Sequence, residues 1–463
     1  MKGRFTVGSP ADSYVAAMNL TDDEIEHREA IVHLLRRTTF GPRVGHVGRL
    51  AGRSYEEIVD DLLAASGDRA VGAAGVDSAR ELPMPFGFRA ALEAERTGET
   101  TEVRTDDDGN PVLEDEDILQ WWLEQLRHPE AGLHERLVWY WHGHFTAHLQ
   151  SGESEMVWNH HVTMRQHALG NFRELTRAML QDPLMLLYLD GAGSNGDSPN
   201  ENLARELMEL FTLGVGNYTE DDVKAGARAL SGWHVDWENN SAWFDPETHY
   251  DRPVSFLGTR GRFGLDEVAD AVCDHPACPT HVATRLYRHL VGVDPAEAEA
   301  ERLGRIFRAA DLEILPLVSA IVRSDGFLAG RRTRPRQPVE WLIGALSALG
   351  ADHAQIDTWQ LHLAGQVPLS PPNVAGWPDD DRWLGASQIL TRVNLVLGRS
   401  WDESLDTGIE PTVDEVLARC SLWDVSPETR TTLEQAIGRQ TEFDSGLELL
   451  FALSLCSPEF ALA

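Results

Sequence analysis

The chain has 463 residues, of which 40 are Lys or Arg and 74 are Asp or Glu, so its formal net charge is −34. A field this negative repels nucleic acid and anionic membranes, and neither is expected as a partner. No run of residues approaches the roughly 18 apolar positions that a membrane span requires. Four cysteines in a chain of this length do not form a disulfide framework. We therefore expect a globular protein with a large buried core.

Helical periodicity or helix-forming composition recurs along most of the chain. The segments with this pattern are 23–38, 54–66, 117–127, 132–149, 154–168, 171–181, 200–213, 219–231, 265–273, 279–291, 296–309, 311–323, 337–349, 384–397, 412–419, 427–437 and 443–455. Extended segments at 233–237, 241–245 and 253–257 predict a small β-hairpin around an aromatic run. The predicted fold class is all-α, a large multi-helix globular domain with a small β-hairpin.

Composition also suggests how the chain is divided. Residues 1–22 are expected to be an N-terminal extension, 23–400 a helical core, and 401–463 C-terminal helices that pack on the core. Within the core, the polar and acidic stretch 97–116 predicts an exposed insertion. The N-terminus lacks the apolar core of a secretory signal, which predicts a cytoplasmic location and leaves export open if a leader has been removed.

The segment from Pro199 to Gly214, PNENLARELMELFTLG, predicts an amphipathic helix with clear ends. At about 100° per residue, its leucines and phenylalanine fall on one side. The opposite side gathers Glu201, Asn202, Arg205, Glu206 and Glu209. An i, i+4 ladder of ion pairs explains Glu201, Arg205 and Glu209 as structure. It leaves the amides and Glu206 unexplained, so this side is also a candidate wall of an active-site cleft.

A second group of polar residues is the run WYWHGHFTAH at 139–148. His142 and His144 lie about 200° apart on a helix and bind one ion only if the helix breaks near Gly143. His144 and His148 have the i, i+4 spacing of helical zinc sites, but the glutamate of a zinc-protease motif is absent. Histidine and carboxylate side chains together can bind a divalent metal, or one can act as the general acid and the other as the general base of a reaction. The alternative is that each ring is buried among tryptophans with one hydrogen bond.

Aromatic residues in non-helical segments form two further groups. One contains Trp233 and His249, and the other contains Trp377 in a proline-rich segment that cannot be helical. Such residues either line a ligand cleft or close the end of a helical core. The cysteine and histidine run CDHPACPTH at 273–281 has metal-like spacing, but prolines interrupt it and the amphipathic helix HVATRLYRHLVG follows, so we expect ordinary buried residues there.

Several of these motifs together resemble the DUF1800 family of bacterial and archaeal proteins. The similar segments are HLLRRTTFGP (33–42), WYWHGHF (139–145), ALGNFRELTRAMLQDPLMLLYLDG (168–191), PNENLARELMELFTLGVGNYTEDDV (199–223), ARALSGW (227–233), the His249 to Gly258 pattern, GQVPLSPPNVAGWP (365–378) and SPEF (457–460). The resemblance implies a mainly α-helical fold and assigns no function. It also implies a partner, because members are often encoded beside a DUF1501 protein similar to alkaline phosphatases or sulfatases. The chain departs from the family by lacking an obvious export signal and by having Gly143 where Asn or Asp is common.

Three functions stay open at this point. The first is metal-dependent hydrolysis in a cleft between the WHGHF and NENLARE helices, with a divalent metal (Zn, Mn or Fe) that activates water. The second is a non-catalytic scaffold that binds a neighbour-encoded enzyme or a glycan. The third is oxygen chemistry at a His/carboxylate iron site. The candidate residues are Glu206, His142 and Arg205 for catalysis, with Arg205 holding an anionic group; Asn200, Asn202, Trp233 and Trp377 for substrate; and His144, Glu206, His249 and His148 for metal.

Overall fold

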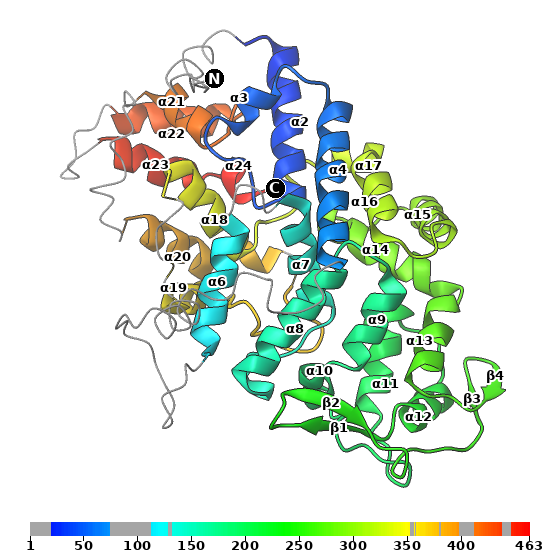
Figure 1. Ribbon diagram of the computed structural model, residues 1–463. Helices are drawn as coiled ribbons and strands as arrows, with labels where there is room; N and C mark the ends of the chain where they lie inside the picture. The colour runs from blue at the N-terminus through cyan, green and yellow to red at the C-terminus, as the bar shows by residue number, and fades with distance from the viewer. Residues whose placement is uncertain are drawn as a thin grey trace, which may run out of the picture.

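The protein was analysed as a computed structural model that describes residues 20–74, 113–127, 132–351, 356, 358–378, 381–397, 412–437 and 446–463. Helices dominate this part of the chain, with two small two-stranded sheets beside them (Figure 1). The predicted all-α class is therefore confirmed. Most of the predicted exposed insertion (97–112) and of the N-terminal extension (1–19) lies outside the described residues. No helix among the described residues is long and apolar enough to cross a membrane.

The elements follow one another in three groups. The first group contains α2 (Asp22–Thr38), α3 (His46–Leu50), α4 (Tyr55–Ala74), α6 (Asp115–Arg127), α7 (Gly132–His144), η2 (Leu149–Ser151), α8 (Ser154–His167), α9 (Phe172–Leu180), α10 (Pro183–Tyr188), α11 (Asn202–Glu206), η3 (Leu207–Thr212) and α12 (Glu220–Ala229). The strands are β1 (Trp233–Asp236), β2 (Ser241–Phe244), β3 (Val254–Phe256) and β4 (Thr259–Gly261). The last group contains α13 (Leu265–Asp274), α14 (Ala277–Val291), α15 (Glu297–Ala309), α16 (Ile314–Val322), α17 (Asp325–Ala329), α18 (Pro338–Leu349), α19 (Thr358–Ala364), η4 (Asp381–Leu384), α20 (Ala386–Leu397), α21 (Val413–Arg419), α22 (Pro427–Ile437), α23 (Gly446–Leu455) and α24 (Pro458–Ala461).

The hairpin predicted around the aromatic run is present. Strands β1 and β2 pair antiparallel, with Trp233 opposite Phe244. The third predicted extended segment does not join them. It forms β3, which pairs with β4 in a second hairpin.

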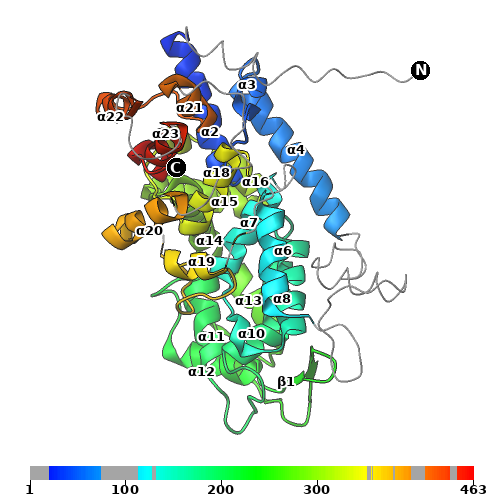
Figure 2. The same ribbon diagram turned by 90° about the vertical axis from the view of Figure 1, so that its left-hand side faces the viewer.

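One contiguous apolar core extends through the described residues, from Ile31 of α2 to Phe460 of α24. The two ends of the chain meet in it: Glu29 of α2 accepts the backbone N–H groups of Trp423 and Asp424 at 3.0 and 3.1 Å. Figure 1 shows α24 beside α2, and Figure 2 shows α21 beside α2. The apolar side chains of the C-terminal helices thus belong to the same core as the N-terminal ones.

Two predicted helices differ from the structure in ways that matter for function. The helix expected over 132–149 ends at His144, and the chain continues in non-helical backbone to η2. The helix expected over 200–213 is α-helical only in α11 and becomes the π-helix η3 from Leu207. The buried residues of this second segment come in pairs four apart (Leu203 and Ala204, Leu207 and Met208, Phe211 and Thr212). A repeat of four residues is longer than the 3.6 residues of one α-helical turn, so a wider helical turn keeps the buried pairs on one face.

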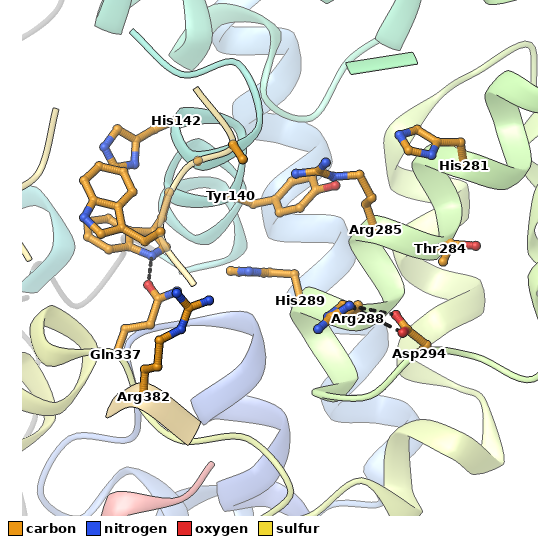
Figure 3. A pocket seen from close by; sticks show the side chains of 14 residues that line it. Tyr140, His142, His281, Thr284, Arg285, Arg288, His289, Asp294, Gln337 and Arg382 are labelled. Atoms are coloured by element: carbon orange, nitrogen blue, oxygen red, sulfur yellow. Dashed lines mark hydrogen bonds and ion pairs between the residues drawn. The ribbon is translucent and has the colours of Figure 1, made fainter. Parts of the chain in front are cut away.

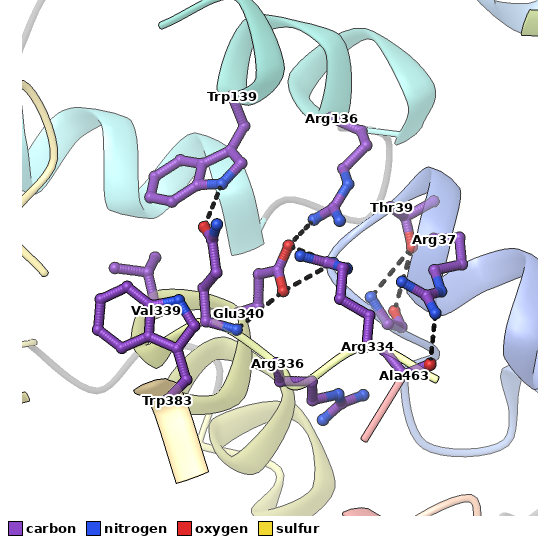
Figure 4. A network of polar contacts seen from close by, with 12 residues as sticks. Arg37, Thr39, Arg136, Trp139, Arg334, Arg336, Val339, Glu340, Trp383 and Ala463 are labelled. Carbon is purple, nitrogen blue, oxygen red and sulfur yellow. Dashed lines mark hydrogen bonds and ion pairs between the residues drawn. The ribbon is translucent and has the colours of Figure 1, made fainter. Parts of the chain in front are cut away.

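A charged group lies inside the core, behind α7. Glu340 of α18 accepts both Arg334 Nη2 contacts at 2.8 and 2.9 Å and also pairs with Arg136 of α7 (Figure 4). All three side chains are buried. Burial alone would raise the pKa of Glu340, but the two guanidinium groups outweigh it and hold this pKa well below its usual range.

We predict that Glu340→Gln lowers the free energy of unfolding by about 3 kcal/mol at neutral pH, because it leaves buried arginine charge uncompensated. Since the folded-state pKa is depressed, this stabilisation is present above the unfolded pKa of about 4.3 and is lost as pH falls below it. The difference in stability between the wild type and the variant should therefore begin to shrink below about pH 5 and go on shrinking as the pH falls further. Denaturant unfolding followed by circular dichroism measures this.

The matched control is Glu434→Gln, which changes an exposed carboxylate. We expect it to leave both the stability and its pH dependence close to wild type. A Glu340→Gln variant whose deficit is the same at every pH would contradict the assigned ion pair.

Candidate pocket between helices α7 and α14

A pocket of about 410 Å³ lies between α7 and α14. Its lining residues are Trp139, Tyr140, His142 and Gly143 from α7; His281, Thr284, Arg285, Arg288 and His289 from α14; and Asp294, Gln337, Ala375, Trp377 and Arg382 from connecting segments and η4. Figure 3 shows Tyr140 and His142 on one side and His281, Arg285 and Arg288 on the other. This volume lies within the range of small-molecule sites.

The polar wall comes from a regular stripe on α14. His281, Thr284, Arg285, Arg288 and His289 follow one another at i, i+3, i+4, i+7 and i+8, so they share one face of the helix. The opposite face of α14 is apolar and packs into the core. The amphipathic pattern of the helix therefore turns a basic stripe toward α7.

Arginines supply the positive charge of the pocket. Burial lowers the pKa of His142 to about 3 and also lowers the pKa of His281, so neither ring carries charge at neutral pH. Among the described residues that line the pocket, Arg285, Arg288 and Arg382 are the arginines and Asp294 is the single carboxylate. Asp294 pairs with Arg288 at 3.4 Å. Among the described residues, no carboxylate lies within ion-pair distance of Arg285, whose Nη1 donates to the Leu210 carbonyl at 3.2 Å.

His142 has a structural position in the wall. Its Nε2 accepts the backbone N–H of Leu369 at 2.9 Å, so the neutral ring carries its proton on Nδ1. Its ring packs against Trp377, with the centroids 4.5 Å apart. Because the basic nitrogen is already occupied, the catalytic acid–base role predicted for His142 gains no support from this geometry.

The proline-rich segment 365–378 lies directly on the backbone of α7. Gly376 has a positive φ of 83°, and a Cβ there would lie 2.5 Å from the Gly143 carbonyl oxygen. This close approach sets Trp377 beside the pocket. Gly143 is different: a Cβ built there meets no heavy atom within 4 Å. The absence of a side chain at Gly143 therefore leaves open space in the wall.

The end of η3 joins α7 and α14. The last carbonyl groups of a helix have no partner within it. Here the Phe211 carbonyl accepts His144 Nε2–H at 2.9 Å, and the Leu210 carbonyl accepts His281 Nε2–H at 3.1 Å as well as Arg285. Burial lowers the pKa of His144 well below its ordinary value, so it is a neutral donor. The WHGHF and NENLARE helices thus do meet, but through backbone carbonyl groups.

The polar side of the 199–214 segment does not line this pocket. Arg205 pairs with Glu201 at 3.1 Å and with Glu220 of α12 at 2.7 Å, an exposed cross-helix network in place of the predicted link to Glu209. Glu209 instead accepts the hydroxyl of Tyr218 at 2.7 Å. These contacts explain the three charged residues as surface structure.

Glu206 and the two amides lie on the same outer side. Partial burial and the neighbouring Glu209 raise the pKa of Glu206. Asn200 Oδ1 accepts the Asn202 backbone N–H at 2.8 Å, and Asn202 reaches Asp190 at 3.5 Å. The amides thus stabilise the start of the helix. The structure does not bring Glu206 or the amides to the pocket where His142 and Trp377 lie.

The four residues predicted to bind metal are not gathered. Among the described residues, no group of three or more His, Cys, Asp and Glu side chains is placed to hold a metal ion. The i, i+4 argument for His144 and His148 was wrong because α7 ends at His144. His148 accepts the Gln150 N–H at 3.1 Å and contacts Ser370. His249 donates to the Ser231 carbonyl at 2.9 Å beside the hairpin that contains Trp233.

The basic face of α14 was not predicted from the sequence. The segment HVATRLYRHLVG was expected to be an amphipathic helix, but no role was assigned to its polar residues. Two arginines and two histidines on one helical face, in a chain with almost twice as many acidic as basic residues, are the signal that points to it.

We predict that His144→Leu lowers the free energy of unfolding by about 1–3 kcal/mol, because the Phe211 carbonyl loses its buried donor. His144→Gln keeps an N–H donor and should recover part of this loss. Urea unfolding of the three proteins measures it. A Leu variant as stable as wild type would contradict the donor role assigned to His144.

Comparison with known proteins gives one match. A family model described as "Protein of unknown function (DUF1800)" covers residues 33–462. No curated protein matches the chain, and no solved structure matches it. Two segments that line the pocket, 139–145 and 365–378, are among those that carry the resemblance. Because the match spans nearly the whole sequence, the chain belongs to the DUF1800 family.

Proposed function

We propose that this protein binds a small molecule carrying an oxyanion group in the pocket between α7 and α14. The observation that carries the proposal is the charge of the lining: its described residues include three arginines and one aspartate, in a chain with a net charge of −34. Folding has therefore concentrated positive charge where the sequence as a whole is strongly negative.

Arginine is well suited to this task. Its guanidinium stays charged and presents five N–H donors that match the oxygens of carboxylate, sulfate and phosphate groups. The bond from Arg285 to the Leu210 carbonyl uses one of these donors and fixes the side chain. A partly enclosed pocket also strengthens the attraction, because its walls are less polar than water.

The other functions have less support. Metal-dependent hydrolysis and iron-dependent oxygen chemistry both need a group of metal-binding side chains, which the described residues do not form at the predicted positions. A docking role for the polar side of α11 competes with its ion pairs to α12. The DUF1501-like partner stays a prediction from family resemblance. The proposal here assigns binding and no reaction.

Gly143 allows a test that adds charge without removing any contact. Gly143→Asp and Gly143→Asn place side chains of equal size in open space within α7. We predict that the Asp variant binds sulfate at least tenfold more weakly than the Asn variant, since its carboxylate opposes the anion and occupies the arginines. Isothermal titration with sodium sulfate at low ionic strength measures the affinities.

Far-ultraviolet circular dichroism checks that both variants fold, and a helical Gly replaced by either residue should not lose stability. Sulfate affinities that are equal in the two variants, or a wild type that binds no sulfate, would contradict the proposed anion site.

A further inference from the structure

The pocket has an aromatic wall on the side of α7, opposite Arg285 and Arg288 of α14 (Figure 3). The rings of Trp139 and Trp377 are stacked at 18° with their centroids 6.4 Å apart, and His142 packs against both. Tyr140 continues this wall toward α14, where it contacts His289 with the ring centroids 5.0 Å apart. A bare oxyanion would use none of these surfaces.

The aromatic and charged parts lie at different depths. Trp139, Tyr140 and His142 are buried, and Trp377 is half-buried. Arg288 and Arg382 are exposed, and Arg285 is half-buried. The pocket therefore has aromatic side chains in its deeper part and arginines at its mouth. An occupant that fits it has a flat apolar part inside and a negative group at the mouth.

The polar atom of the deepest indole is already used. Trp139 Nε1–H donates to Gln337 Oε1 at 3.1 Å, and the same oxygen accepts Gln366 Nε2–H at 2.9 Å. Because Trp139 is only 3% exposed, the indole that a ligand would meet in this wall is that of the half-buried Trp377. Aromatic rings gain affinity from such surfaces by stacking and edge contacts.

The volume agrees with an occupant larger than an inorganic ion. The pocket volume of about 410 Å³ is more than ten times the roughly 30 Å³ that one water molecule occupies in the liquid. It leaves room for one ring in addition to an oxyanion. Resting on the proposed function, we infer that the natural ligand class is a one-ring aryl oxyanion, with its ring against Trp377 and its acid group at Arg285, Arg288 and Arg382.

The test compares benzenesulfonate with methanesulfonate, with inorganic sulfate and with neutral benzyl alcohol. Because both sulfonates carry one negative charge across the working pH range, their comparison isolates the ring. We expect benzenesulfonate to bind wild type about tenfold more tightly than methanesulfonate, and benzyl alcohol to bind much more weakly than benzenesulfonate. Titration calorimetry at low ionic strength gives the affinities.

Trp377→Leu should lower the ratio of benzenesulfonate affinity to methanesulfonate affinity from about tenfold to within about twofold. Far-ultraviolet circular dichroism checks that the variant folds. The matched control is Trp237→Leu, which changes an indole that is 53% exposed in the β1–β2 connection and does not line the pocket. It should keep the ratio of about tenfold.

The outcomes separate the two proposals. Sulfate binding that is weakened by Gly143→Asp supports the anion site. If benzenesulfonate then binds no more tightly than methanesulfonate, or if its tighter binding survives Trp377→Leu, the inference about the ring is overturned and the anion site stands. If neither sulfate nor benzenesulfonate responds to Gly143→Asp, the anion site itself is overturned.

Discussion

The arrangement of the candidate site depends on two backbone carbonyl groups at the end of a π-helix. The carbonyls of Leu210 and Phe211 are buried between three helices, and side chains from two of those helices supply their donors. His144 comes from α7, whereas His281 and Arg285 come from α14. One helix end therefore fixes the separation of the two walls of the pocket. A site built on rigid helices in this way holds its side chains in place before a ligand arrives.

The second constraint is electrostatic. Among the described residues, few carboxylates are buried, whereas arginines gather at the pocket and in the core next to it. Glu340 compensates the arginines of the core, and Arg285 has a backbone carbonyl in place of a carboxylate partner. Histidines add little charge, since burial keeps His142 and His144 neutral. The pocket should therefore keep its preference for anions over a wide pH range.

The sequence predicted most of the longer helices, because apolar periodicity and end signals are local, but it missed short ones such as α10 and α19. It also identified Trp377 and His142, which lie together in the pocket wall. It could not show that α7 ends at His144, since the residues after it continue the composition of a helix. That single boundary removed the expected pairing of His144 with His148.

Other differences arise from contacts between distant segments. The basic stripe of α14 lines the pocket, whereas Glu206 does not. The buried pairs around Leu207 recur every four residues, which fits the π-helix found there, whereas an ordinary α-helix was expected from the sequence. Which carbonyls the π-helix presents, and to which side chains, follows from tertiary packing alone.

An anion bound between Arg285, Arg288 and Arg382 can be located by anomalous diffraction from a crystal soaked in selenate, a heavy analogue of sulfate. We predict a selenium peak between α7 and α14, with the selenate oxygens about 3 Å from guanidinium nitrogens. Selenium peaks confined to other surfaces, with none in this pocket, would contradict it.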